Sequence, residues 1–161
     1  MKKIALIMGS DSDMPVVEKA VSVLKKLEIP HTVHIMSAHR TPDRTSAFAK
    51  NAESEGYGVL VAFAGKAAHL AGVIAANTVL PVIGVPIKGS DLGGLDALLA
   101  TVQMPSGIPV ATVAIDGGAN AAWLAARMLS NEEPELREKL RVEAARMAAE
   151  VEAKDNKLNN N

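Results

Sequence analysis

The apolar residues of this chain alternate between two patterns, and this alternation constrains the fold more than any other feature. Five short runs are almost continuously apolar and are bounded by Gly, Pro or Ser, which is typical of strands buried on both faces. They cover residues 4–8, 32–36, 58–64, 81–86 and 109–115. The segments between them have helical spacing, at about 15–27, 42–55, 67–77, 92–102 and 119–129. Because strands that alternate with helices form parallel sheets, we predict an α/β fold, a three-layer α/β/α sandwich around a five-stranded parallel sheet.

A further helix is predicted over residues 131–154, after the alternating unit ends. Its apolar residues recur every three or four positions and form a narrow stripe, namely Leu136, Leu140, Ala144, Met147 and Val151. This stripe is expected to be buried either against its own domain or against a neighbouring subunit. We predict one α/β domain over residues 1–154, in which 131–154 is a packing helix, and a disordered polar tail over 155–161.

The composition excludes several classes of function. Lys and Arg number 17 against 18 Asp and Glu, so no large basic face for nucleic acid is expected. The absence of cysteine removes thiol catalysis and disulfides, and four aromatic residues provide no stacking platform for single strands. No apolar run approaches the roughly 20 residues of a membrane span, and the N-terminus does not resemble a signal peptide. We expect a soluble, cytoplasmic protein.

Polar clusters follow the first three predicted strands, at the sheet edge where open parallel sheets bind ligands. The first cluster is Gly-Ser-Asp-Ser-Asp at 9–13. The hydroxyls of Ser10 and Ser12 and the free N–H groups at a helix N-terminus suit a phosphate, and Asp13 could accept from ribose hydroxyls. The alternative is that Ser12 or Asp13 only caps the following helix.

The second cluster is Ser-Ala-His-Arg-Thr-Pro-Asp at 37–43. Thr41 and Pro42 are ordinary helix-start residues, which leaves His39 and Arg40 to project into the ligand crevice. An arginine fork suits a phosphate, and a histidine can take and return a proton near neutral pH. A surface histidine without function is the alternative for His39.

The third cluster is Ala-Gly-Lys-Ala-Ala-His-Leu at 64–70, where Gly65 allows close approach to a ligand and His69 could bind it or serve only the fold. By contrast, His31 and His34 lie at or within the second strand and are expected to be structural or exposed. No recognised metal-ligand spacing, dinucleotide fingerprint or serine-nucleophile elbow is present. The residues alone therefore indicate a small phosphorylated, ribose-like ligand and proton transfer by His39.

The three clusters together, with residues 102–110 and 119–122, resemble N5-carboxyaminoimidazole ribonucleotide mutase, the catalytic subunit of phosphoribosylaminoimidazole carboxylase. The resemblance covers about residues 4–130. It implies a flavodoxin-like fold, a homo-octamer with shared active sites, no metal or organic cofactor, and coupling to the ATP-dependent synthetase that forms the carbamate. The implied reaction moves a carboxylate from the exocyclic nitrogen of an imidazole nucleotide to ring carbon C4, in purine (IMP) biosynthesis.

The resemblance also implies roles for individual residues. His39 matches the general acid/base, Ser10 and Arg40 the phosphate ligands, and Asp13 the ribose ligand. Further substrate contacts are expected from Ser12, Ser37, Ala38, Gly65, Lys66, His69 and Leu70, of which the last four belong to an expected carbon dioxide pocket.

Two departures from the commonest family form are Lys66 and Ala71, which stand where glycine and proline are expected. Three alternatives stay open at this point. The chain could carboxylate aminoimidazole ribonucleotide directly with carbon dioxide, it could be a non-catalytic module that senses a phosphoribosyl ligand, or it could be an assembly protein that works mainly through its C-terminal helix.

Overall fold

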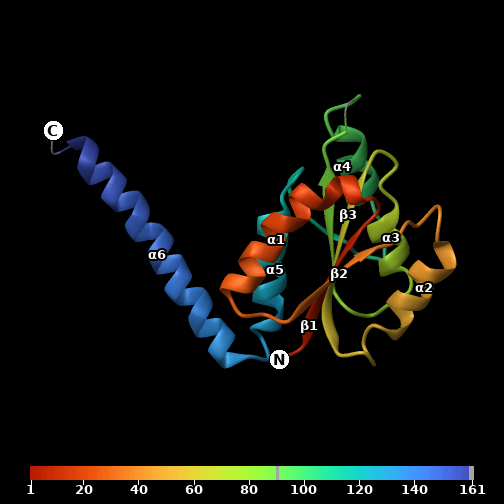
Figure 1. Cartoon of the computed structure of the whole chain (residues 1–161), viewed down its shortest axis with the longest axis horizontal. Coiled ribbons are helices and arrows are strands. Elements are labelled where there is room, and N and C mark those ends of the chain that lie inside the picture. The colour runs from red at the N-terminus through yellow and green to blue at the C-terminus, as the bar shows by residue number, and fades with distance from the viewer. Residues whose placement is uncertain (90, 160–161) are drawn as a thin grey trace.

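The chain folds around a five-stranded parallel sheet, as the computed structural model shows for residues 1–89 and 91–159 (Figure 1). The strands are β1 (Lys3–Met8), β2 (His31–Ile35), β3 (Tyr57–Gly65), β4 (Val82–Ile87) and β5 (Ala111–Thr112), in the spatial order β2-β1-β3-β4-β5. The chain moves to one side of β1 for β2 and to the other side for β3, so the ligand-binding switch point lies between β1 and β3. The predicted α/β class is confirmed.

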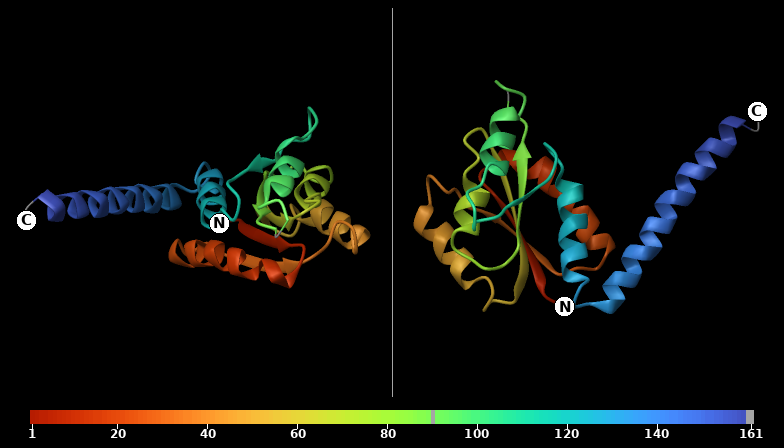
Figure 2. Two further views of the ribbon diagram at one scale, coloured as in Figure 1. Left: turned by 90° about the horizontal axis from the view of Figure 1, so that it is seen from above. Right: turned by 180° about the vertical axis from the view of Figure 1, so that it is seen from behind.

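Helices cover both faces of the sheet. A single 3-10 turn, η1 (Asp11–Asp13), precedes α1 (Met14–Lys26), and the other helices are α2 (Pro42–Asn51), α3 (Leu70–Ala75), α4 (Leu95–Val102), α5 (Gly118–Leu129) and α6 (Pro134–Asn159). Figure 2 shows α1 and α5 on one side of the sheet and α2 and α3 on the other. This arrangement is the three-layer sandwich predicted from the sequence.

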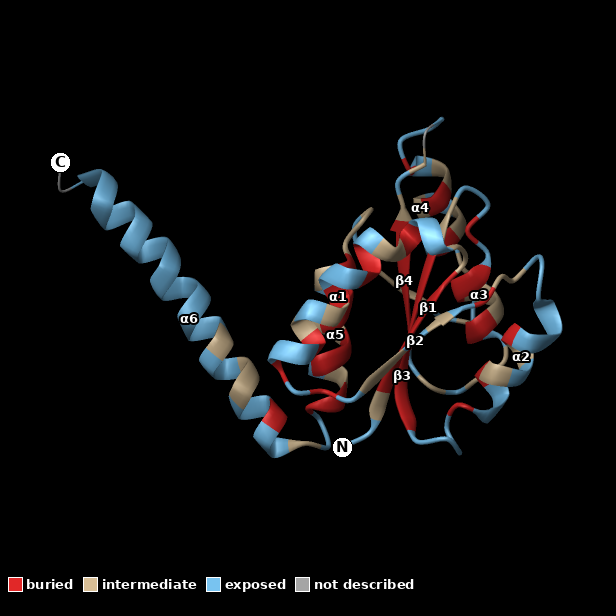
Figure 3. Cartoon of the chain, viewed as in Figure 1, coloured by how far each residue is buried: buried red, intermediate tan, exposed pale blue. Residues whose placement is uncertain are grey.

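Strand alternation divides the core into two halves. Along β1, Ile4 and Leu6 pack in the half covered by α1 and α5, whereas Ala5 and Ile7 pack in the half covered by α2 and α3. All four side chains are completely buried. Figure 3 shows the central strands in the colour of buried residues. Because both faces of β1 are apolar, the strand reads as a continuous hydrophobic run, which is how the sequence pattern identified it.

Small residues bring α3 and α4 close to the sheet. A Cβ atom at Gly84 of β4 would lie 2.3 Å from Thr101 Cγ2 of α4 and 3.4 Å from Ala71 Cβ of α3. Both helices therefore cover the same face of β4, and glycine is required there by close packing.

β5 and α3 are shorter than the sequence predicted. β5 contains two residues where seven were expected, because beyond Thr112 the chain makes only isolated bonds to β4, such as Val113 N to Gly84 O at 3.1 Å. α3 begins at Leu70 and not at residue 67, because Lys66 has a positive φ of 53° and residues 66–69 form tight turns.

α6 starts three residues later than the predicted start at residue 131 and ends five residues beyond the predicted end at residue 154. It starts at Pro134, since proline at the first helical position loses no hydrogen bond, and it continues to Asn159. Residues 155–159, expected to be disordered, are therefore helical, and residues 160–161 of the expected tail lie outside the described residues. Leu136, near the start of α6, is fully buried. Further along, α6 points away from the α/β sandwich, and Met147 and Val151 of the apolar stripe are 41% and 66% exposed.

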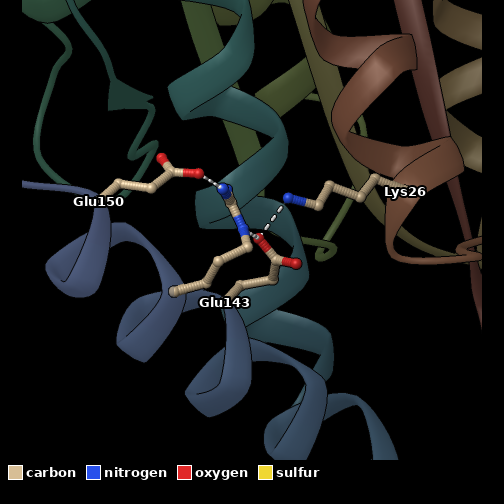
Figure 4. Close-up of polar contacts among 4 residues, drawn as sticks. Lys26, Glu143 and Glu150 are labelled. Atoms are coloured by element: carbon tan, nitrogen blue, oxygen red, sulfur yellow. Dashed lines mark hydrogen bonds and ion pairs between the residues drawn. The ribbon is translucent and has the colours of Figure 1, made fainter. Parts of the chain in front are cut away.

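Ion pairs support α6 where apolar contacts end. Lys26 of α1 and Arg146 of α6 both contact Glu143, and Arg146 also contacts Glu150 (Figure 4). The Arg146 Nε–Glu143 Oε2 distance is 2.9 Å. Pairs three and four residues apart stabilise exposed helices. In the part of the chain that the structure describes, no helix is both long and apolar enough to cross a membrane.

Candidate active site

A cavity of about 580 Å³ opens at the carboxyl ends of the central strands. Its walls are the loops after β1, β2 and β3 and the end of β4, and its volume is in the range of small-molecule sites. All eleven residues expected to bind substrate or act in catalysis line it, namely Ser10, Ser12, Asp13, Ser37, Ala38, His39, Arg40, Gly65, Lys66, His69 and Leu70. The topology brings them together because parallel strands end at the same sheet edge.

The first loop places two hydroxyls and one carboxylate at the cavity wall. Ser10 caps η1, since its Oγ accepts from Ser12 N at 3.4 Å. Asp13 stands at the start of α1 but makes no side-chain cap bond. Capping of α1 therefore does not explain why Ser10, Ser12 and Asp13 occur in this loop. Their side chains line the cavity, where a ligand could contact them.

Asp13 is an unusual carboxylate because it is 7% exposed. Its one side-chain hydrogen bond comes from Ser12 Oγ at a long 3.4 Å. Burial raises its pKa above the ordinary value of 3.8, hydrogen bonding from Ser10 and Ser12 opposes this rise, and the negative charges of Asp11 and Asp116 add to it. The site thus holds a carboxylate that gains from any further hydrogen-bond donor.

Arg40 connects the first two loops. Its Nη2 donates to the Gly9 carbonyl at 2.8 Å, and its Nε and backbone N lie 3.5 and 3.1 Å from Ser37 Oγ. The guanidinium is thereby fixed beside Ser10, and a guanidinium has five donors, enough to bind an anion as well. The two loops form one anion-binding corner.

His39 meets a second histidine from the third loop. Its Nε2 lies 2.8 Å from His69 Nδ1, and the rings are edge-on with centroids 5.0 Å apart. One ring must donate and the other accept, so the pair holds a single proton between the two nitrogens. This contact between residues 30 positions apart gives the His39 ring a defined hydrogen-bond partner.

The third loop closes the far side of the cavity with small groups. A Cβ at Gly65 would lie 3.5 Å from the Ile87 carbonyl, so the backbone of β3 and the end of β4 are in close contact there. Lys66 is exposed, and its Nζ lies 3.8 Å from Asp91 Oδ2 in the next loop. Leu70 is buried and gives this end of the cavity an apolar wall.

The sequence reasoning missed the fourth wall, which is formed by Ile87, Lys88 and Gly89. The available signal was its place at the carboxyl end of β4, the strand beside β3. His31 and His34 lie outside the cavity, as expected: His31 Nδ1 is 2.8 Å from Ile29 O, and His34 Nε2 is 2.8 Å from Thr32 Oγ1.

The cavity therefore has an anion-binding corner, a buried carboxylate, and a histidine pair beside a small apolar wall. Within residues 1–89 and 91–159, no three His, Asp or Glu side chains are grouped so that they could hold a metal ion. The arrangement can bind a phosphorylated sugar and move a proton at a group held near His39.

Known proteins match the chain over most of its length. The family model described as AIR carboxylase matches residues 3–150. A Pyrococcus horikoshii protein named N5-carboxyaminoimidazole ribonucleotide mutase is 56% identical over 155 residues, which are 96% of this chain and 88% of that protein. A Saccharomyces cerevisiae protein named phosphoribosylaminoimidazole carboxylase is 57% identical over 126 residues, which are 78% of this chain but 22% of the yeast protein.

A solved structure has the same fold. The crystal structure of Treponema denticola PurE superimposes with a TM-score of 0.88 at 30% sequence identity, and the match covers 96% of this chain and 97% of that one. The sheet order, the site at the switch point and these similarities agree with one another. The chain belongs to the AIR carboxylase family.

Proposed function

We propose that this chain is an isomerase that converts N5-carboxyaminoimidazole ribonucleotide to 4-carboxy-5-aminoimidazole ribonucleotide in purine biosynthesis. The observation that carries the proposal is the contact of His39 with His69 at 2.8 Å, in the cavity that also contains the anion-binding corner of Ser10 and Arg40. Relatives that bear the mutase name are similar over nearly the whole chain. The reaction needs a phosphate site, a ribose site and one acid/base, and the cavity offers candidates for each.

Binding is proposed to begin at the anion-binding corner. The hydroxyl of Ser10 and the guanidinium of Arg40 hold the substrate phosphate, with Ser12, Ser37 and Ala38 lining the same part of the cavity. Asp13 accepts hydrogen bonds from the ribose hydroxyls, which supply the donors that its buried carboxylate lacks. The imidazole ring then reaches towards His39.

Proton transfer by His39 carries the chemistry. Protonation of the carbamate nitrogen breaks the bond between nitrogen and the carboxyl carbon, and carbon dioxide and aminoimidazole ribonucleotide form. The electron-rich C4 attacks the carbon dioxide, a carbon–carbon bond forms, and His39 takes back the proton that C4 loses. Holding both fragments in one cavity replaces a bimolecular encounter, which is worth about 7–11 kcal/mol.

The carbon dioxide is proposed to stay near the third loop. Gly65, Lys66 and Leu70 surround this end of the cavity together with His69. Gly65 and Leu70 are the small and apolar groups here, and they leave room for a small neutral molecule and offer water few partners.

Assembly into a homo-octamer, a cytoplasmic location and coupling to the carbamate-forming synthetase are part of this proposal. Apolar side chains on two helices support assembly, because Leu95 and Leu99 of α4 and Met147 and Val151 of α6 are 41–66% exposed. Light scattering is expected to give a multimer, and a stable monomer would contradict this part.

The test of the function is turnover of the carbamate nucleotide without ATP or added metal, coupled to the next enzyme of the pathway. His39→Asn is expected to lower kcat about 100- to 10,000-fold with little change in KM, because a positioned general acid/base contributes this much. His31→Asn is the matched control, since His31 lies outside the cavity.

Each other outcome identifies a rival. Product formed only from aminoimidazole ribonucleotide and bicarbonate would make the chain a direct carboxylase. Nucleotide binding without turnover in the unmodified protein would make it a binding module. Activity that survives His39→Asn would remove His39 from its role.

A further inference from the structure

Asp116 lies between β5 and α5, outside the residues that line the cavity, and has an unusual backbone. Its φ is 56°, in the left-handed region that favours glycine. Among residues with a side chain, Asn and Asp enter this region most easily. A carboxylate therefore occupies a position where glycine would be less strained, which calls for a contact that glycine could not make.

The carboxylate makes that contact with the fourth wall of the cavity. Asp116 Oδ1 accepts a hydrogen bond from the backbone N–H of Lys88 at 2.9 Å. The backbone N–H of Asp116 donates to the Pro86 carbonyl, also at 2.9 Å. Asp116 thus holds the chain on both sides of Ile87 through two hydrogen bonds, which together form its grip on the wall. A hydrogen bond to a charged acceptor is stronger than one between neutral groups.

The wall that Asp116 grips stands against the third loop. The Ile87 carbonyl lies 3.5 Å from the position of a Cβ at Gly65, and Lys66 Cγ lies 3.8 Å from that of a Cβ at Gly89. Ile87, Lys88 and Gly89 therefore close the end of the cavity where the proposed reaction holds carbon dioxide. Because Gly65 and Gly89 have no side chains, the two segments meet there through backbone, and the wall depends on fixed backbone positions to stay closed.

We propose that Asp116 is a positioning residue that holds the wall of Ile87, Lys88 and Gly89 in place, so that carbon dioxide stays in the cavity between its release and its recapture. The inference rests on the proposed function, because only a reaction that releases and recaptures carbon dioxide needs such a wall. Loss of the grip lets carbon dioxide leave, and the carbamate nucleotide then takes up one proton and ends as free aminoimidazole ribonucleotide.

Two substitutions separate the hydrogen bond from the backbone conformation. Asp116→Gly accepts the positive φ and deletes the acceptor, whereas Asp116→Asn tolerates the same φ and keeps an oxygen for the Lys88 N–H. The fraction of substrate released as aminoimidazole ribonucleotide is expected to rise several-fold in Asp116→Gly and to stay near the unmodified value in Asp116→Asn. The value of kcat/KM is expected to fall about 3- to 10-fold in the glycine variant, as for one lost hydrogen bond.

A second measurement does not depend on activity. Amide hydrogen exchange at Lys88 is expected to be several-fold faster in Asp116→Gly than in Asp116→Asn, because only the glycine variant loses the acceptor. Equal release of aminoimidazole ribonucleotide by the glycine variant and the unmodified protein would overturn the proposal. So would unchanged exchange at Lys88, or an asparagine variant that behaves like the glycine variant. No turnover by the unmodified protein would refute the function, while exchange at Lys88 would still report on the grip.

Discussion

The buried carboxylate of Asp13 predicts a site where function opposes stability. Its pKa is raised above 3.8 in the folded chain, chiefly by burial, with contributions from Asp11 and Asp116. A raised pKa means that the folded state binds this proton more tightly than the unfolded state does. The contribution of protonated Asp13 to the free energy of unfolding is therefore fully present below pH 3.8. It is lost as the pH rises through the raised pKa of the folded state. At neutral pH the ionised Asp13 destabilises the fold.

Asp13→Asn removes this charge and keeps the size of the side chain. A buried polar group with incomplete hydrogen bonding costs about 1–3 kcal/mol, and Asp13 has one long bond of 3.4 Å from a side chain. We expect the free energy of unfolding of the variant to be about 1 kcal/mol higher at neutral pH, which raises Tm by about 2–4 °C for a chain of this size. The substrate should bind about 10- to 100-fold more weakly, because a charged acceptor for the ribose is lost.

The assay is urea unfolding of both proteins at equal protein concentration, at pH 7.5 and at several lower values, because assembly makes apparent stability depend on concentration. The gain is expected to shrink as the pH falls and to vanish below 3.8, where Asp13 is protonated in both states. Asp155→Asn is the control, since Asp155 is exposed on α6 and should change stability by less than about 0.5 kcal/mol. An Asp13→Asn variant that is less stable at neutral pH, or whose gain does not depend on pH, would refute the reasoning.

Two further predictions concern the histidine pair and the packing behind the site. His69→Leu removes the ring partner of His39 and is expected to lower kcat about 10- to 100-fold and to alter its pH profile, with KM within about twofold; steady-state kinetics that leave kcat unchanged would contradict the pairing. Gly118→Ala would place a Cβ 2.2 Å from the Val16 carbonyl and is expected to lose about 1–3 kcal/mol in urea unfolding. In Gly89→Ala the nearest atom to the new Cβ would be Lys66 Cγ at 3.8 Å, so this control variant should keep its free energy of unfolding. Similar losses of stability in both variants would count against close packing as the cause.

Local sequence patterns were enough to predict most of the fold and the polar residues of the three loops at the cavity. The apolar runs located every strand because β1, β3 and β4 are buried on both faces, and the sheet edge gathered the polar clusters after them. The pattern failed where long-range contacts decide. Nothing in the residues around Thr112 reveals how few ladder bonds β5 makes, and nothing around Lys66 reveals that its turns delay α3.

The contacts within the site could not be predicted for the same reason. His39 and His69 are 30 positions apart, and only the order of β2, β1 and β3 brings their rings within hydrogen-bond distance. The grip of Asp116 on Lys88 spans 28 positions and depends on β5 lying beside β4. The stripe was predicted to be buried, but of its residues Leu136 alone is fully buried within the chain, because α6 points away from the sandwich (Figure 1). Its burial against a neighbouring subunit stays a prediction.

The place of β2 at the rim of the sheet has a consequence for the lifetime of the protein. β2 lies at the edge of the sheet beside β1, and its Val33 and Ile35 are exposed, so we expect it to open more easily than the central strands. The loop that follows it carries Arg40, which is joined to Gly9 after β1. A nucleotide that bridges these two loops ties β2 to its neighbour and reduces the open population that a protease can cut. We therefore expect a bound nucleotide to slow proteolysis of the chain, through the same loops that are proposed to bind it.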